Sequence, residues 1–266
     1  MTSDKNNLNY YLDIEPEIIR VGQYKKSWYG LKFSGTQDIK FEREMMPWSI
    51  NNDLNEILIL LKNKLELQGG GDQLINISLP VSQAIIKTVE VPILDPKDIR
   101  EAINFHTFWE NLIQLPGVIE DYSIAYEIVG KNKNTGVSTL FVLIIKREIL
   151  THINDVSKHN GFTVNLIEPR FISLLKIYYE EKKIKRKKDF ILVEIGPVEN
   201  YLIIISNNIP IVINLFLSQQ DKLNLQNGLS DRDYNQKLTK KYVSQIEQAI
   251  IAKKDVLKDS KLSDIF

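Results

Sequence analysis

Strand-like and helix-like runs alternate along this chain, and their order constrains the fold more than any other feature. Apolar runs rich in isoleucine, such as 201–206, predict strands, whereas apolar residues at 54, 57, 58, 61 and 65 predict one face of an α-helix. Two units of three strands followed by a helix stand at the start and near residue 190, with a mixed segment between them. The pattern predicts an α/β fold.

Turn residues and periodicity set the predicted boundaries. Asp95-Pro96 is typical of a helix start, and Asn160-Gly161 is typical of a helix end. The predicted strands are 9–14, 17–24, 27–33, 39–43, 74–79, 84–91, 122–129, 138–145, 162–167, 190–195, 201–206 and 209–217. The predicted helices are 54–65, 95–112, 147–159, 169–183 and 231–258, with a loop at 218–229.

Composition excludes several functional classes. Lys plus Arg and Asp plus Glu each total 34 among 266 residues, and this zero net charge argues against a protein that coats nucleic acid or an anionic membrane. The absence of cysteine excludes disulfides, cysteine-bound zinc, Fe–S clusters and thiol nucleophiles. Because the first nine residues are polar and carry no signal peptide, we expect a cytoplasmic protein.

Two segments have competing interpretations. The most apolar one, 201–217, is short for a membrane span and has Asn207-Asn208 near its centre, so it predicts a β-hairpin. The basic run Lys182–Lys188 is compatible with nucleic-acid binding. A solvated helix–strand connection is the favoured interpretation, because cations stabilise a helix C-terminus and no aromatic residues alternate with these.

The sequence contains no motif for catalysis or metal binding. The histidines at 106, 152 and 159 have no metal-ligand spacing, and nucleophile-elbow, P-loop and dinucleotide-binding motifs are absent. Gly69–Gly71 follows a helix and precedes a strand, which is the reverse of a phosphate-binding loop, so we predict a turn there. We therefore predict no catalytic residue and no metal site.

An ordered series of segments carries a family resemblance over about residues 9–217. The series runs Ile77–Pro80, Ile86–Pro92, Asp95–Ile103, Asp121–Tyr126, Leu140–Lys146, Asn160–Phe162, Glu168–Phe171 and Ile191–Gly196. In this order the segments resemble the type IV pilus assembly protein PilM and its competence homologues.

The resemblance implies an actin-like (RNase H-like, FtsA-like) α/β fold in a degenerate and shortened form. It places a first actin-like subdomain at 9–77 and 146–188, an inserted α+β subdomain of the 1C type at 78–145, and an abbreviated second lobe at 189–266. In the family a strand and a Gly-Gly adenine-binding loop follow the long helix, so a chain that stops at Phe266 is expected to lack that loop.

The family's ATP site is expected to be degenerate here. In the first phosphate loop Glu15 replaces a glycine, and a phosphate oxygen ~4 Å from the carboxylate of Glu15 or Glu17 is repelled by about 4 kcal/mol. In the second loop Pro197 removes an N–H donor and Glu199 adds a negative charge. The resemblance assigns the nucleotide-site positions to Asp13, Glu168, Glu194 and Gly196. We expect no bound cofactor.

The favoured function is a cytoplasmic, non-catalytic scaffold (a pseudo-ATPase) of a type IV pilus or competence machine for DNA uptake. The resemblance implies that the chain binds the N-terminal cytoplasmic peptide of a PilN-like inner-membrane protein. It also implies contact with other pilus assembly proteins, and with the membrane only through such partners. Phe105, Phe108 and Trp109 are candidates to line the peptide groove, although aromatic residues more often fill a core.

The alternative function is an active actin-like ATPase of the same machinery, which would use ATP and Mg²⁺. The resemblance then implies that Asp13, Glu168 and Glu194 position the magnesium ion and the attacking water.

Overall fold

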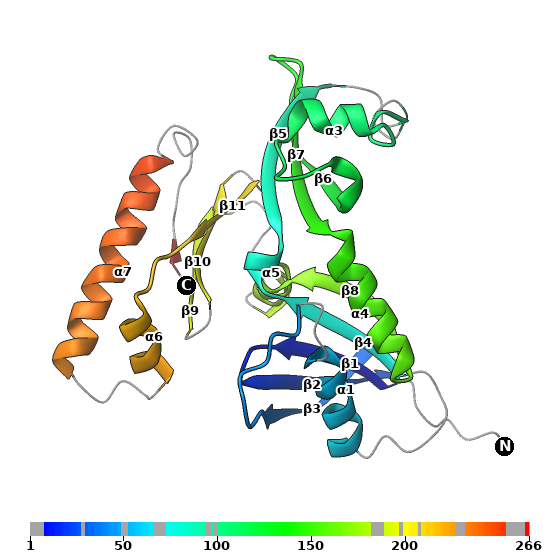
Figure 1. Ribbon diagram of the computed structural model, residues 1–266. Helices are drawn as coiled ribbons and strands as arrows, with labels where there is room; N and C mark the ends of the chain where they lie inside the picture. Colours follow the sequence, from blue (N-terminus) through cyan, green and yellow to red (C-terminus); the bar gives the residue numbers. More distant parts are fainter. Residues whose placement is uncertain are drawn as a thin grey trace. The chain divides into compact units, whose positions relative to one another are not determined.

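The structure is a computed structural model (Figure 1). It describes residues 8–27, 30–48, 53–65, 73–93, 97, 101–181, 189–196, 199–206, 209–226, 232–253 and 264–265. The chain divides into two compact units. The first unit comprises Met1–Ile85, Glu120–Ser123 and Ile144–Lys176, and the second comprises Ile86–Ile119, Ile124–Leu143 and Ile177–Phe266.

The first unit is built on a five-stranded mixed sheet of order β3-β2-β1-β4-β8. Strands β1 (Leu8–Ile14), β2 (Ile18–Ser27) and β3 (Gly30–Lys40) form an antiparallel meander. Strands β4 (Gln73–Leu79) and β8 (Phe162–Pro169) continue the sheet parallel to β1. Strand β3 is one continuous strand, where the sequence predicted two shorter ones at 27–33 and 39–43.

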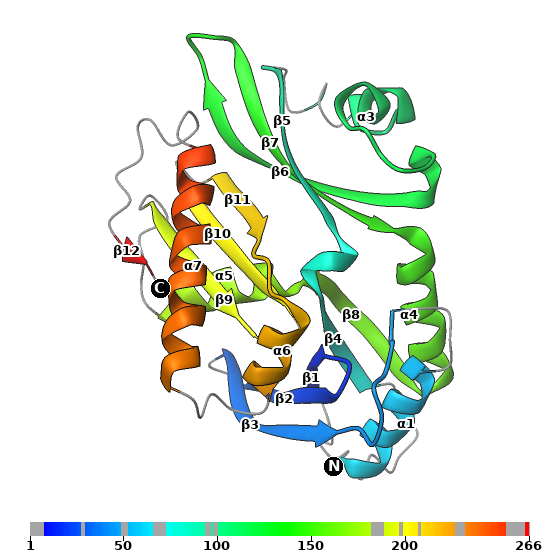
Figure 2. The same ribbon diagram turned by 60° about the vertical axis from the view of Figure 1, so that its left-hand side comes forward.

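Helices α1 (Asp53–Lys64) and α4 (Arg147–His159) lie side by side in the first unit (Figures 1 and 2). The predicted apolar face of α1 is confirmed, since its side chains are fully buried at Leu54, Ile57, Leu58 and Leu61. Residues on one face of the sheet are also buried: Leu12, Ile14, Ile19, Val21, Ile75 and Ile77. Helix α5 (Arg170–Glu181) follows β8 directly.

A three-stranded sheet of order β5-β7-β6 forms the middle of the chain. Its strands are β5 (Ile85–Pro92), β6 (Tyr122–Asn132) and β7 (Val137–Lys146). Two 3-10 turns, Val81–Gln83 and Ile119–Asp121, precede β5 and β6. The helix predicted at 95–112 is not continuous, because a turn and a bend at 103–105 precede α3 (His106–Leu112). Its predicted start at Asp95-Pro96 lies outside the described residues.

The last sheet has the order β11-β10-β9-β12. Strands β9 (Phe190–Ile195), β10 (Asn200–Ser206) and β11 (Ile209–Asn214) are antiparallel neighbours, and β12 (Asp264–Ile265) pairs parallel to β9. The pairing of β10 with β11 confirms the hairpin predicted at 201–217. In the described part of the chain, none of the helices combines the length and apolar character that a membrane crossing requires.

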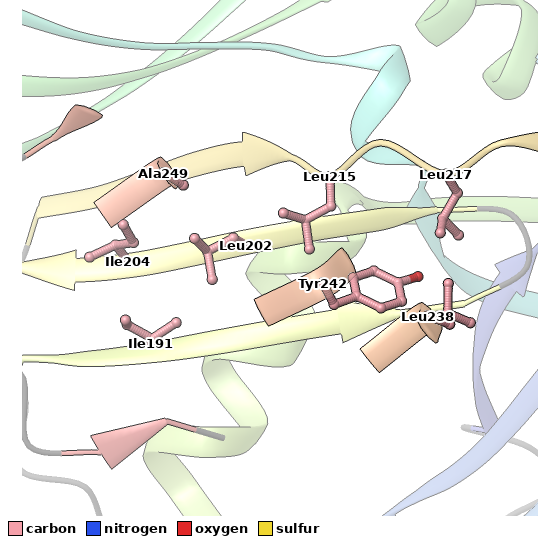
Figure 3. Close-up of a cluster of buried hydrophobic side chains, with 8 residues drawn as sticks. All are labelled: Ile191, Leu202, Ile204, Leu215, Leu217, Leu238, Tyr242 and Ala249. Atoms are coloured by element: carbon pink, nitrogen blue, oxygen red, sulfur yellow. The ribbon is translucent and has the colours of Figure 1, made fainter. Parts of the chain in front are cut away.

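Helix α7 (Arg232–Ala252) covers the sheet formed by β9, β10 and β11 (Figure 2). Side chains from one face of α7 pack on side chains from the strands and from the segment after β11 (Figure 3). The buried cluster consists of Ile191, Leu202, Ile204, Leu215, Leu217, Leu238, Tyr242 and Ala249. This cluster is the hydrophobic core of the last sheet.

The prediction of a loop at 218–229 is wrong for residues 219–226, which form helix α6 (Gln219–Gln226). The Ser218 hydroxyl accepts the Asp221 backbone N–H at 3.2 Å, and the Asp221 carboxylate accepts the Ser218 backbone N–H at 3.0 Å. This reciprocal capping box starts a helix whose apolar periodicity is weak. The Asp221 carboxylate also accepts hydrogen bonds from Lys241 and Tyr234 of α7, which ties the two helices together.

The carboxyl group of Asp221 is expected to make the stability of the fold depend on pH. Hydrogen bonds from Lys241, then Tyr234 and Ser218, hold the pKa of its carboxyl group well below its ordinary value. A carboxyl group whose pKa is lowered by folding stabilises the fold at pH values above its unfolded-state pKa of about 4. This stabilisation is lost as the pH falls from there toward the pKa of the folded state. We expect Asp221→Asn to cost about 1–3 kcal/mol at pH 7, a difference that shrinks steadily at acid pH. Urea unfolding over a pH series measures this difference.

Asp155→Asn is the control, because Asp155 is an exposed residue of α4. It should change stability by less than about 0.5 kcal/mol at every pH. A difference between wild type and Asp221→Asn that stays constant down to acid pH would contradict the assignment.

Candidate functional site

The candidate site lies at the carboxyl ends of three parallel strands in the first unit. Asp13 of β1 pairs in register with Ser78 of β4, and Ser78 pairs with Glu168 of β8. Arg20 of β2 stands opposite Asp13 on the other side. In open α/β sheets, ligands bind beyond the carboxyl ends of such strands. The sheet register therefore gathers charged side chains at the edge where a ligand is expected.

The tip between β1 and β2 is closed by backbone hydrogen bonds. The Glu15 N–H donates to the Ile18 carbonyl at 2.9 Å, and the Ile18 N–H donates to the Glu15 carbonyl at 3.4 Å. The Pro16 carbonyl accepts the Met45 N–H at 2.6 Å, so the tip is also attached to the segment after β3. A phosphate-binding loop needs backbone N–H groups that point at the ligand. Here the Glu15 N–H is engaged within the hairpin, and Pro16 has none.

Arg170, the first residue of α5, contacts both carboxylates of this hairpin. Its Nε and Nη2 atoms lie 2.9 Å and 2.7 Å from Oδ1 of Asp13. Its Nη1 atom lies 3.1 Å from Oε1 of Glu15. The side chains of Arg170 and Glu15 are only 9% and 10% exposed, so this pair is buried. Buried charges of this kind require partners, because an isolated ion is costly to remove from water.

Arg20 completes the group from the opposite side. Its Nη1 atom lies 2.9 Å from Oε1 of Glu15 and 3.3 Å from Oδ2 of Asp13. The hydrogen bond with Glu15 raises the pKa of the Arg20 guanidinium above its ordinary value. We call Asp13, Glu15, Arg20 and Arg170 the ion-pair cluster. Its two carboxylates and two guanidinium groups have a net charge of zero.

The ion-pair cluster changes the electrostatic prediction made from the sequence. The sequence predicted that the carboxylates of Glu15 and Glu17 repel a phosphate oxygen. In the structure the charge of Glu15 is compensated by two arginines and Glu17 is exposed, so simple repulsion is not the main electrostatic feature of this hairpin. The donors at the predicted phosphate position are engaged by the chain's own acceptors, an arrangement that does not fit a bound phosphate group. Sequence reasoning missed Arg20 and Arg170, although Arg170 stands two residues after the predicted Glu168.

Glu168, near the end of β8, lies beside the cluster and is bound by the following helix, α5. Its carboxylate accepts a hydrogen bond from the Ser173 hydroxyl at 2.7 Å and another from the Lys176 ammonium group. Both partners belong to α5, so Glu168 fastens the start of that helix to the end of β8. In the part of the chain that is described, no three acidic or histidine side chains come together as a metal site.

The second predicted phosphate loop, between β9 and β10, is also closed on itself. The Gly196 N–H points at the Glu199 carbonyl and the Asn200 side-chain oxygen, each at 3.1 Å. The Asn200 amide returns a hydrogen bond to the Gly196 carbonyl at 2.8 Å. The Tyr242 hydroxyl of α7 donates to the Asn200 oxygen at 2.6 Å, and burial raises the pKa of Tyr242 above its ordinary value. Pro197 lies outside the described residues.

The four predicted nucleotide-site positions fall in different units. Asp13 and Glu168 belong to the first unit, and Glu194 and Gly196 belong to the second. The sheet register brings Asp13 and Glu168 to one edge through Ser78. A shared site of all four residues stays a prediction. The basic run Lys182–Lys188 lies outside the described residues.

The three predicted partner-binding aromatics occupy different environments. Trp109 is buried, and its indole N–H donates to the Ile103 carbonyl at 2.8 Å, so it is a core residue of the second unit. Phe108 packs edge-to-face on Trp109 with ring centroids 5.1 Å apart. Phe105 is 64% exposed. Of the three, Phe105 offers the most accessible ring, and the groove itself stays a prediction.

No protein-family model matches the sequence, and no curated protein matches it either. Among solved structures, the chain is similar to a chain of the PilM–PilN type IV pilus biogenesis complex. The alignment has 13% identity and a TM-score of 0.63, and it covers 92% of this chain and 72% of the other. The two chains share a fold. The α/β fold predicted from the resemblance to PilM is therefore confirmed.

Two further structures are more distant from this chain than the PilM–PilN chain. One is the cytoplasmic domain of EpsL, an inner-membrane component of the type II secretion system of Vibrio cholerae, with 13% identity, a TM-score of 0.47, and 79% and 72% of the two chains covered. The other is a Bacteroides thetaiotaomicron protein of actin-like ATPase fold and unknown function, with 10% identity, a TM-score of 0.41, and 97% and 90% covered. Similarities this weak support no conclusion about function.

Proposed function

We propose that this chain is a PilM-like, non-catalytic scaffold of a type IV pilus or competence machine. The observation that carries the proposal is the shared fold with a chain of the PilM–PilN complex, at a TM-score of 0.63 over 92% of this chain. The ordered series of sequence segments that resembles PilM is independent support. On this proposal the chain works in the cytoplasm and reaches the inner membrane only through its partners.

The proposed partner is the N-terminal cytoplasmic peptide of a PilN-like inner-membrane protein, and other pilus assembly proteins complete the machine. The structure similar to this chain is itself a complex with PilN. In the three-stranded sheet, β5 and β6 are the outer strands. An extended peptide can add to such an edge through main-chain hydrogen bonds. The exposed ring of Phe105 in the same subdomain would supply an apolar contact.

The non-catalytic part of the proposal is supported by the two closed loops. The ion-pair cluster engages both arginines at the first loop, and Asn200 engages Gly196 at the second. A phosphate group would have to displace these internal acceptors before it could be bound. The alternative, an active ATPase of the same machinery, requires that displacement.

The test is binding of a fluorescent PilN-like N-terminal peptide to the full chain, measured by anisotropy. We expect saturable binding with a dissociation constant of about 1–100 µM, and none with a scrambled peptide. Phe105→Ala should weaken binding by about tenfold. The matched control is Phe216→Ala, because Phe216 is similarly exposed but follows β11 in the last sheet. If the folded chain binds none of the PilN-like peptides tested, the scaffold proposal is contradicted.

A further inference from the structure

The antiparallel hairpin of β2 and β3 ends in a short aromatic connection. The last pair in its register is Ser27 with Gly30, so Trp28 and Tyr29 alone join the two strands. Two-residue connections favour glycine, asparagine and aspartate, because these residues tolerate the positive φ angles that such turns need. Trp28 and Tyr29 themselves lie outside the described residues. An aromatic pair at this place in the sequence breaks the usual rule for turns, and such exceptions are expected at functional sites.

The same end of the hairpin is positively charged. Residues 25–32, which we call the hairpin tip, include Lys25, Lys26 and Lys32 and no acidic residue. The register pairs Lys25 with Lys32, and like charges directly opposite each other destabilise a pair of strands. On the other side, β1 places Leu8 opposite Lys25 and so adds no carboxylate. The exposed Lys32 has no ion-pair partner among the residues that the structure describes. An external anion would relieve this repulsion.

The hairpin tip is separate from the candidate site. Arg20, which belongs to the ion-pair cluster, stands seven positions before Ser27 on β2, or roughly 23 Å along an extended strand. Strand β3 is an outer strand of the five-stranded sheet, so no further strand of that sheet covers the hairpin from outside. A ligand at the hairpin tip therefore has its own binding surface.

We propose that the hairpin tip is a docking point for an anionic lipid surface. Tryptophan and tyrosine are enriched where membranes meet water, because each combines an apolar ring with a polar N–H or O–H group. Lysines are attracted to anionic headgroups, and their carbon chains can lie along the apolar boundary. Trp28 and Tyr29 supply the apolar contact, and the three lysines supply the electrostatic contact.

The hairpin tip suits a lipid surface better than a single-stranded nucleic acid, the other polyanion that basic and aromatic residues bind. A nucleic-acid strand runs along a groove on which successive bases stack, whereas this tip is the end of a single two-stranded hairpin. Leu31 adds aliphatic surface, which suits acyl chains better than bases. The zero net charge of the whole chain is compatible with a local contact, since exposed charges beyond a Debye length are screened.

This inference goes beyond the proposed function, in which the chain reaches the inner membrane only through partners. A weak direct contact beside a partner anchored in the same membrane would raise the overall affinity through effective concentration. Direct contact can be measured without any partner, and peptide binding can be measured without lipid. Failure of one proposal is therefore distinguishable from failure of the other.

The experiment is co-sedimentation of the full-length chain with vesicles of phosphatidylcholine, either alone or with about 30% phosphatidylglycerol. We expect partitioning onto the anionic vesicles to be at least about tenfold stronger, and this difference to disappear at about 1 M salt. The triple variant Lys25→Gln, Lys26→Gln and Lys32→Gln should lose at least about tenfold in binding to anionic vesicles. The double variant Trp28→Ser and Tyr29→Ser should lose about tenfold as well.

Two matched controls change the same chemistry elsewhere. Lys62→Gln with Lys237→Gln and Lys240→Gln removes three exposed lysines of α1 and α7. Phe105→Ser with Phe216→Ser removes two rings that are 64% and 70% exposed. Both controls should bind anionic vesicles like the wild type.

Vesicles with brominated acyl chains test the contact at residue 28 itself. They should quench the tryptophan fluorescence of the wild type. Trp28→Tyr keeps an amphipathic ring but removes the indole, so it should still bind while most of the quenching disappears.

Circular dichroism identifies any variant that does not fold, and Trp28→Tyr then replaces the serine variant. Equal partitioning of the wild type onto neutral and anionic vesicles would overturn the proposal. So would wild-type binding by the folded lysine variant, or losses of the same size in the two controls. Binding of a single-stranded oligonucleotide by a chain that does not bind vesicles would also overturn it and favour a nucleic-acid contact.

Discussion

Arg170→Met should lower the free energy of unfolding by about 3–5 kcal/mol, the largest effect that we expect from any single change at the candidate site. Methionine fills similar volume but leaves Asp13 and the buried Glu15 without their inner guanidinium group. Arg20 remains, but it is nearly half exposed and compensates only part of the charge. Urea unfolding at pH 7 measures the loss.

Two further variants separate the cluster from a general loss of positive charge. Arg147→Met removes an exposed arginine of α4 that donates a single hydrogen bond to the Glu120 carbonyl, and it should cost less than about 1 kcal/mol. In the Arg170→Met background, Glu15→Gln should recover part of the stability, because the uncompensated buried charge is gone. Equal losses for Arg170→Met and Arg147→Met would rule out a stabilising cluster.

Ile204→Ala should destabilise the fold by about 2–5 kcal/mol through the core of the last sheet. Ile204 is fully buried, stands opposite Ile191 in the register of β10 and β9, and packs under α7 (Figure 3). The substitution removes three carbon atoms from a cluster whose neighbours are fixed by the sheet, so a cavity remains. Thermal and urea unfolding of the same protein preparation measure this effect.

The control for the core is Ile251→Ala on α7. Ile251 is 69% exposed, so the same chemical change there should stay within about 0.5 kcal/mol. If both isoleucine variants lose similar stability, then the packing of α7 on β10 is not the source of the stabilisation.

The spacing of apolar residues predicted the helices and strands whose buried residues follow that spacing. The apolar spacing of α1 matches its buried residues, and the apolar run at 201–206 matches β10, which is buried along its whole length. Helix α6 was not predicted, because its apolar periodicity is weak and its start depends on the reciprocal hydrogen bonds between Ser218 and Asp221. Strand β12 was not predicted, because two residues are too few to show an apolar pattern.

The candidate site was harder to predict than the fold, because its key contacts are distant in sequence. Asp13 and Arg170 are separated by 157 positions and meet only when β8 pairs in the sheet. The sequence identified Asp13 and Glu168 through the resemblance to PilM, and it identified Glu15 as unsuited to phosphate. It did not predict that Arg20 and Arg170 compensate the carboxylates, since that depends on the register of β1 with β2 and on the start of α5.

On the proposed function, the carboxylates of Asp13 and Glu15 occupy the predicted phosphate position of an actin-like ATPase through their contacts with Arg20 and Arg170. Calorimetric titration of the full-length wild-type chain with Mg-ATP tests this central claim most directly. We expect no saturable heat up to a nucleotide concentration of about 1 mM. Saturable binding with a dissociation constant of about 10 µM or lower would contradict the claim and favour the active ATPase.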